Sequence, residues 1–355
     1  MIPGLPRKAS TPARPDASDT SRGENVMNRR DHLKLAGFAA VAAATGTISL
    51  SGNARAQTAP AVASPLVNLG VYRYRVGEFA VTAIQDGGFA GPPLERVVTN
   101  AEFPAVQAAL ADVFQPTDRF PITFTTLIVE TGQHTVAIDA GAAGFFGVSA
   151  GHLPAGLTAA GIDPAKVDVV LLSHLHPDHI TGLRTASGDL LFPNATIHAP
   201  RGELDYWLDE ATAGRAAEAA RPFFQNAVRV LGPVSSAIVR IAGESEVVPG
   251  ITAIPAHGHA PGHTVFQIAS GTEGLLVIGD VANNPALFVR NPDWQPVFDM
   301  DRAMAAETRR RLLDRAAADR LHVAGYHFPF PAHGYIRRDG NGFAFVPSPW
   351  TPQFG

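Results

Sequence analysis

The stretch SHLHPDHITG, residues 173–182, places four coordinating side chains within six positions: His174, His176, Asp178 and His179. Burying a histidine or an aspartate without a partner costs on the order of several kcal/mol or shifts its charge state. At the end of a strand, His174 and His176 point the same way, because alternate side chains share a face. A divalent cation would satisfy all four side chains, so the stretch predicts part of a metal site.

Further candidate ligands follow downstream. The segment AHGHAPGHTVF supplies His257, His259 and His263, VIGDVANN supplies Asp280, and AGYHFPFPAHG supplies His327. Each lies at the end of an expected strand or in the loop after it, where sites are commonly built. The chain has no cysteine, so the ligands must be His, Asp or Glu. This donor set suits zinc, manganese, iron or cobalt and does not choose among them.

Short strands alternating with helices must position these residues. Apolar patterns predict strands in the segments 74–87, 122–141, 167–174, 195–200, 236–241, 246–255, 263–269, 275–280 and 321–326. Helices are expected at 152–161, 201–210, 212–229 and 301–318. Two runs of strands, each flanked by helices, predict two sheets packed face to face with helices outside, in one α/β domain of four layers.

The motif H-x-H-x-D-H, followed by separate His, Asp and His motifs, resembles the metallo-β-lactamase fold superfamily from about residue 70 to residue 350. Within that superfamily the chain is most similar to methyl parathion hydrolase and its lactonase-like relatives. The resemblance is carried by DAGAAGFFG, SHLHPDH, FPNA, DYWL, VPGI, HGHAPGHT and HFPFPAHGYIRRDGNGFAFVP. It implies a four-layer αββα sandwich.

The resemblance also implies a ligand set for two divalent metal ions, zinc first and manganese, iron or cobalt as alternatives. One ion would be held by His174, His176 and His259, the other by Asp178, His179 and His327, with Asp280 bridging. Asp139 would orient a ligand histidine through its free N–H, although it could equally be a turn residue at a strand end. The H-x-P-G-H form makes His259 a ligand and places His263 behind it.

By the same resemblance, a substrate pocket includes four aromatic residues and one asparagine: Phe89, Phe146, Trp207, Phe223 and Asn283. Each aromatic residue could instead belong to the core. Aromatic walls suit flat, uncharged substrates. Asn283 and Asn284 stand where the organophosphate enzyme is aliphatic, which favours a lactone or ester carbonyl over a phosphotriester.

The expected activity is hydrolysis by a metal-bridging hydroxide, with Asp178 and Asp280 as catalytic residues. The substrates expected are neutral lactones, aryl esters and organophosphate triesters, since the sequence shows no separate general acid. A β-lactamase and a glyoxalase-type thioesterase are weaker alternatives, because no basic residue stands out for an anionic substrate. A mononuclear iron sulfur dioxygenase and a non-catalytic metal-binding protein remain open.

Residues 27–56 combine the pair Arg29 and Arg30, a short apolar segment and an A-x-A site, which is typical of a twin-arginine export signal. We expect residues 1–26 to be disordered or to precede the true start at Met27, residues 57–69 to be a linker, and residues 70–355 to form a periplasmic or secreted hydrolase domain. Without residues 1–56 the chain keeps 20 basic and 28 acidic residues. That charge disfavours nucleic acid as a partner. No membrane span is expected in the mature protein, and a homodimer is implied by resemblance.

Overall fold

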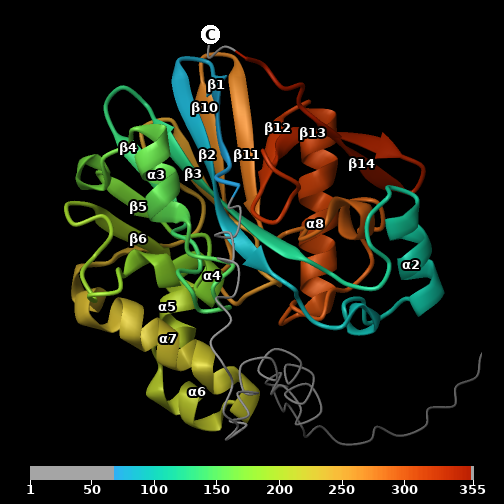
Figure 1. Cartoon of the computed structure of the whole chain (residues 1–355), viewed down its shortest axis with the longest axis horizontal. Helices are drawn as coiled ribbons and strands as arrows, with labels where there is room; N and C mark the ends of the chain where they lie inside the picture. The colour runs from blue at the N-terminus through green and yellow to red at the C-terminus, as the bar shows by residue number, and fades with distance from the viewer. Residues whose placement is uncertain (1–67, 353–355) are drawn as a thin grey trace, which may run out of the picture.

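Two sheets of seven strands each pack face to face in the computed structural model, which describes residues 68–352 (Figure 1). Along the first sheet the order is β1 (Val71–Val76), β2 (Phe79–Phe89), β3 (Ile122–Glu130), β4 (Thr135–Ile138), β5 (Val169–Leu171), β6 (Thr196–Pro200) and β7 (Val239–Ile241). The second contains β8 (Ser245–Val248), β9 (Ile251–Pro255), β10 (Thr264–Ser270), β11 (Glu273–Gly279), β12 (His322–Gly325), β13 (His333–Asp339) and β14 (Gly342–Pro347).

Helices cover the outer face of each sheet (Figure 1). On the side of the first sheet lie α3 (Leu153–Ala160), α4 (Pro177–Ile180), α5 (Arg201–Trp207), α6 (Glu210–Arg215) and α7 (Arg221–Leu231). On the other side lie α2 (Phe103–Ala111) and α8 (Arg302–Ala318). Short turns of helix are η2 (Leu94–Arg96), η3 (Pro164–Lys166), η4 (Thr181–Leu183), η5 (Glu218–Ala220), η6 (Gly232–Ala237) and η7 (Pro285–Val289). The predicted four-layer αββα sandwich is confirmed.

The layers form because buried and more exposed side chains alternate along the strands. In β1, Tyr72, Tyr74 and Val76 are buried between the sheets, where they belong to one cluster with Phe266 and Leu275 of the second sheet. Each large apolar side chain buried this way contributes roughly 1.5–3 kcal/mol. Two further apolar clusters lie beneath the helices on the outer faces.

Parallel pairing brings the functional loops to one edge. Strands β4, β5, β6 and β7 pair in parallel, as do β11 and β12. Parallel neighbours require a crossover connection, usually through a helix, and α8 supplies the one between β11 and β12. The carboxyl ends of paired strands therefore meet, and the loops that follow them lie together.

Two features were not predicted. The first is the short helix α2. The second is the hairpin of β13 and β14 at the edge of the second sheet, in which Asp339 pairs with Gly342 and the residues Gly340 and Asn341 form the turn. Gly340 has a φ of 57°, which glycine adopts without strain.

The export signal expected at residues 27–56, the segment 1–26 and most of the linker lie outside the described residues. None of the helices in the described part of the chain has the length and apolar character needed to cross a membrane.

Candidate metal centre

Seven side chains, each from a segment that follows a strand, converge at this edge of the sandwich. His174 and His176 follow β5, Asp178 and His179 lie on α4, His259 follows β9, Asp280 follows β11 and His327 follows β12. We call His174, His176 and His259 the three-histidine group, and Asp178, His179 and His327 the carboxylate group. In each group the candidate ligand atoms lie within 4.8 Å of one another.

The three-histidine group directs ring nitrogens at one point. His176 Nδ1 lies 2.9 Å from His174 Nε2 and 3.0 Å from His259 Nε2. His259 Nδ1 lies 3.0 Å from a carboxylate oxygen of Asp299, so Nδ1 carries the proton and Nε2 presents a lone pair. Burial lowers the pKa of His174 and of His176 well below the usual range, which keeps both rings neutral. Neutral imidazoles sharing one point are the arrangement that a cation requires.

The carboxylate group is fixed in the same way. His327 Nδ1 donates to the carbonyl of Thr123 at 2.8 Å, so Nε2 faces the site. His179 Nδ1 donates to Asp139 Oδ2 at 2.8 Å, and the buried His179 Nε2 has no hydrogen-bond partner. Burial alone would lower the pKa of His179, yet Asp139, Asp178 and Asp280 raise it well above the usual range. The group therefore carries excess negative charge that a cation would balance.

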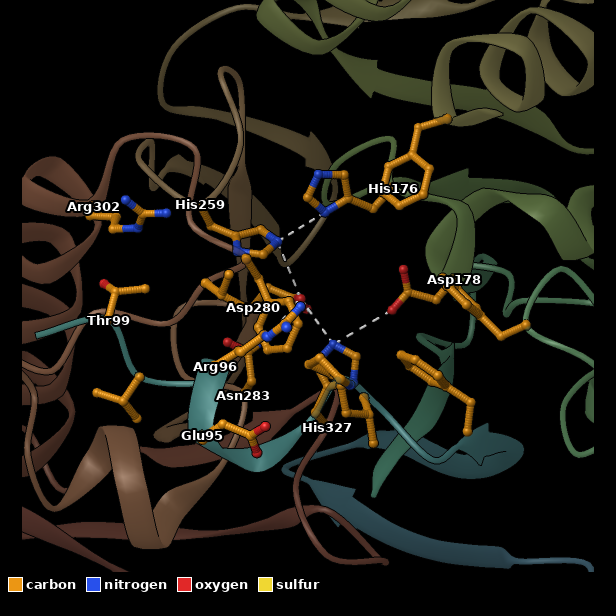
Figure 2. Close-up of a pocket in the computed structure, with 18 of the residues that line it drawn as sticks. Glu95, Arg96, Thr99, His176, Asp178, His259, Asp280, Asn283, Arg302 and His327 are labelled. Atoms are coloured by element: carbon orange, nitrogen blue, oxygen red, sulfur yellow. Dashed lines mark hydrogen bonds and ion pairs between the residues drawn. The ribbon is translucent and has the colours of Figure 1, made fainter. Parts of the chain in front are cut away.

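Asp280 lies beside both groups. Its Oδ2 is 3.3 Å from His259 Nε2 and 2.9 Å from His327 Nε2 (Figure 2), and its Oδ1 is 3.2 Å from His179 Nε2. Oδ1 is buried without a hydrogen-bond partner. Burial alone would raise the pKa of Asp280, but His327, His179 and His259 hold it well below the usual range. An ionised carboxylate between two sets of imidazoles fits the bridging position that the sequence predicts.

Asp139 and His263 stand behind these residues. Asp139 has a φ of 59°, uncommon outside glycine, and accepts from the backbone N–H and the hydroxyl of Ser173, both at 2.8 Å. His263 Nδ1 donates to the carbonyl of Ala256 at 3.1 Å, and its Nε2 accepts from the N–H of Asp280 at 3.1 Å. Both ring nitrogens of His263 are thus engaged, which supports an orienting role and leaves His259 to face the site. The other candidate in that loop, His257, is exposed.

Glu203 is a support that sequence reasoning missed. It is fully buried on α5, where Oε2 accepts from the N–H of Leu175 and from Trp207 Nε1, both at 2.9 Å, and Oε1 accepts from the N–H of Gly262 at 2.6 Å. Leu175 and Gly262 belong to the two loops that carry the three-histidine group. Glu203 therefore ties these loops together; the only signal in the sequence was an acidic residue on the buried face of a helix following β6.

Asp299 is the second missed support. Its Oδ1 holds His259 Nδ1, and its Oδ2 accepts from Arg309 Nη2 at 2.8 Å in an ion pair with no exposure of either side chain. The two residues stand in separate segments, before and within α8, so nothing local in the sequence links them to His259.

The cluster lies at the base of a pocket of about 580 Å³. Phe89, Phe146, Phe223 and Asn283 line it, as the sequence predicts. Phe89 and Phe146 stack with ring centroids 4.5 Å apart. The prediction for Trp207 is wrong: its side chain is 1% exposed and does not line the pocket, because its indole N–H is turned inward to the buried carboxylate of Glu203.

The structure changes two further predictions about the pocket. Asn284 accepts from the N–H groups of Ala286 and Leu287 and donates to Gln115, so it caps η7 and does not meet substrate. In the sequence no basic residue stood out for an anionic substrate, but the structure places Arg96 and Arg302 in the lining of the pocket. Asn283 Nδ2 donates to Asp280 Oδ2 at 3.0 Å, which places its amide between the metal centre and the pocket.

An αββα sandwich that gathers histidines and carboxylates at its strand ends is the scaffold of a class of metal-dependent hydrolases. A model of the metallo-beta-lactamase superfamily matches residues 119–327, more than half of the chain. The chain belongs to the metallo-beta-lactamase superfamily. Comparison with curated proteins gives no significant match.

Solved structures of the same fold are similar to the whole domain. The hydrolase AbOPH in the beta lactamase superfamily has 26% identity and a TM-score of 0.75, over 81% of this chain and 100% of that chain. AidC, a dizinc quorum-quenching lactonase in complex with a product, N-hexnoyl-L-homoserine, has 24% identity and a TM-score of 0.74, over 80% and 99%. A probable metal-dependent hydrolase from Staphylococcus aureus has 20% identity and a TM-score of 0.66, over 78% and 99%.

Proposed function

We propose that this protein is a binuclear metal-dependent hydrolase of lactones and aryl esters, with organophosphate triesters as a second substrate class. The observation that carries the proposal is the pair of ligand groups, three-histidine and carboxylate, with Asp280 in contact with both. Two divalent cations bound there would provide a water of pKa about 7 and polarise the oxygen of the bond under attack.

Asp178 is the residue placed to hold a proton. Its carboxylate faces the pocket, and burial raises its pKa. Asp178 Oδ2 lies 3.6 Å from His327 Nε2 (Figure 2) and 3.5 Å from His179 Nε2. A carboxylate oxygen at this position could accept a proton from the attacking water and return it to the leaving oxygen.

The pocket favours leaving groups that need little protonation in order to depart. No tyrosine or lysine lines its described part, and the hydroxyl of Tyr326 is engaged at 2.6 Å with the carbonyl of Asp178. Phe89, Phe146 and Phe223 give the apolar wall on which a flat phenolic group can lie. Phenolate leaving groups suit this arrangement, as in aryl esters, lactones of phenols such as dihydrocoumarin, and triesters with phenolic groups.

The structural likeness to AidC makes lactones a substrate class to test. That structure is described as a dizinc lactonase holding an acyl-homoserine product. At 24% identity the likeness carries only the fold, so the substrate rests on the pocket of this chain and on the test below.

Initial rates of the purified protein on dihydrocoumarin, an acyl-homoserine lactone, methyl parathion and a cephalosporin test the proposal. We expect hydrolysis of dihydrocoumarin, lost on chelation and restored by Zn²⁺ or Mn²⁺, with Asp280→Ala as the inactive control. Turnover of the cephalosporin alone would indicate a β-lactamase. Oxygen uptake with a sulfur substrate and one bound iron would indicate a dioxygenase, and metal binding without any turnover would indicate a non-catalytic protein.

A further inference from the structure

Two arginines stand at the rim of the pocket. Arg96 is the last residue of η2, and Arg302 is the first residue of α8. Both line the same cavity as five residues of the metal centre: His176, Asp178, His259, Asp280 and His327. Figure 2 shows Arg96 and Arg302 among the residues that line this pocket.

Backbone contacts hold both arginines near the site. The N–H of Asp301 donates to the carbonyl of Gly258 at 2.8 Å, and the N–H of Met300 donates to the carbonyl of His259 at 3.1 Å. The start of α8, and with it Arg302, is thereby tied to the loop that carries His259.

The segment after Arg96 is tied down in the same way. The N–H of Val297 donates to the carbonyl of Val97, and the N–H of Thr99 donates to the carbonyl of Gln295, both at 2.9 Å. These contacts fix the backbone of both segments, so the two arginines extend from defined backbone positions on the pocket wall.

Neither arginine has an anionic partner in the described part of the chain, whereas Arg290, Arg309 and Arg310 each pair with an aspartate. Arg302 Nε is buried and has no hydrogen-bond partner. A buried guanidinium N–H without an acceptor is costly. A ligand with a negatively charged hydrogen-bond acceptor would remove this cost for Arg302.

The remaining charges of the pocket leave these arginines available. Asp178 and Asp280 belong to the proposed metal centre, where cations would balance them. Glu95 is the one other acid among the described lining residues, and it is exposed. Against Glu95 stand Arg96 and Arg302, so the rim beyond the metal centre carries a net positive charge.

We propose that the substrate is a lactone or ester that bears a carboxylate away from the bond that is cleaved, and that Arg302 and Arg96 bind this carboxylate. The proposal rests on the proposed function and narrows its neutral substrates to monoanionic ones. Hydrolysis adds one water across the acyl C–O bond and gives an acid and an alcohol, while the distal carboxylate does not react. Arginine suits this role because its planar fork matches a carboxylate.

The specificity ratio between two esters of equal carbon number tests the proposal. These are mono-4-nitrophenyl glutarate, which carries a distal carboxylate, and 4-nitrophenyl valerate, which carries a methyl group there. We expect the wild-type protein to prefer the glutarate ester in kcat/KM by at least about tenfold, which corresponds to about 1.4 kcal/mol. Arg302→Gln should lower this ratio about tenfold, mainly through KM. Arg96→Gln should lower it about threefold, because exposed charge pairs are weaker.

Two control variants separate a binding role from a structural one. Arg302→Lys keeps the positive charge and should restore part of the preference. Arg337→Gln makes the same change of charge on an exposed arginine of β13 and should leave the ratio as in the wild type. Melting temperatures identify any variant that fails to fold. Equal loss on both esters, or a wild type without preference, would overturn the proposal while leaving the hydrolase function intact.

Isothermal titration calorimetry tests whether the arginines bind the carboxylate even if neither ester is cleaved. Glutarate and valerate are titrated separately into the metal-loaded protein, so that both offer one carboxylate to the centre and only glutarate offers a second. Tighter binding of glutarate in the wild type, lost when Arg96 and Arg302 are both changed to Gln, supports the proposal. Equal affinity for the two acids contradicts it.

Discussion

Glu203→Gln is the change that should reveal how the two ligand loops are held together. The carboxylate accepts three hydrogen bonds, two at Oε2 and one at Oε1, and has no exposed surface. An amide of the same shape offers one acceptor oxygen and one NH₂ group. If the oxygen keeps the N–H groups of Leu175 and Trp207, the NH₂ group faces the N–H of Gly262, and two donors then oppose each other.

One buried N–H left without an acceptor costs about 1–3 kcal/mol. For a domain of this size we therefore expect the melting temperature to fall by about 2–4 °C for each kcal/mol lost. The unpaired N–H belongs to Gly262, next to His263 in the loop that carries His259, so the affinity for metal should also fall, by about 10- to 100-fold.

The assay is a zinc titration against a competing chelator, with melting curves recorded with and without zinc. Glu210→Gln makes the same chemical change on the neighbouring helix at an exposed residue, and it should alter neither quantity. A Glu203→Gln protein with the zinc affinity and melting temperature of the wild type would refute the view that this carboxylate holds the loops.

Four further changes have separate readouts. Asp280→Ala should abolish both metal loading and turnover, while His263→Ala should reduce turnover and retain metal; elemental analysis of both variants distinguishes them, and the reverse pattern would contradict the assignment. Burial lowers the pKa of His333 to about 4, so protons bind preferentially to the unfolded chain below about pH 6.5, and the free energy of unfolding should fall as the pH drops from about 6.5 to about 4. His333→Phe should flatten that slope in denaturant titrations, and an unchanged slope would assign it to other groups. Replacing Arg29 and Arg30 by Lys should keep the precursor in the cytoplasm if residues 27–56 are a twin-arginine signal, and cell fractionation checks this.

The metal centre could be predicted because each of its residues has a signal in the neighbouring sequence. Each candidate ligand follows the end of an apolar strand. Of these strands β11 and β12 pair in parallel, and β9 is joined to β11 through the antiparallel strand β10, so the loops that follow all three lie at one edge of the second sheet. Asp139 could be anticipated for the same reason, since it directly follows β4. The layers of the fold followed from strand alternation, although the hairpin of β13 and β14 was missed despite its Gly-Asn turn.

The supports of the centre could not be anticipated because they depend on tertiary contacts. Glu203 and Trp207 stand four residues apart on one helix, and the sequence does not show that the indole N–H turns toward the carboxylate and away from the pocket. Likewise, Arg96 and Arg302 lie 206 positions apart in the numbering and meet only through the packing of η2 and α8 around the cavity.

The stoichiometry of activation tests the central claim most directly. The metal-free protein is titrated with Zn²⁺ while bound zinc and the initial rate on dihydrocoumarin are measured in the same samples. The two ligand groups predict that binding saturates at two ions per chain and that the rate reaches its plateau only as the second ion binds. Saturation at one ion, or a rate independent of zinc, would contradict a binuclear hydrolase.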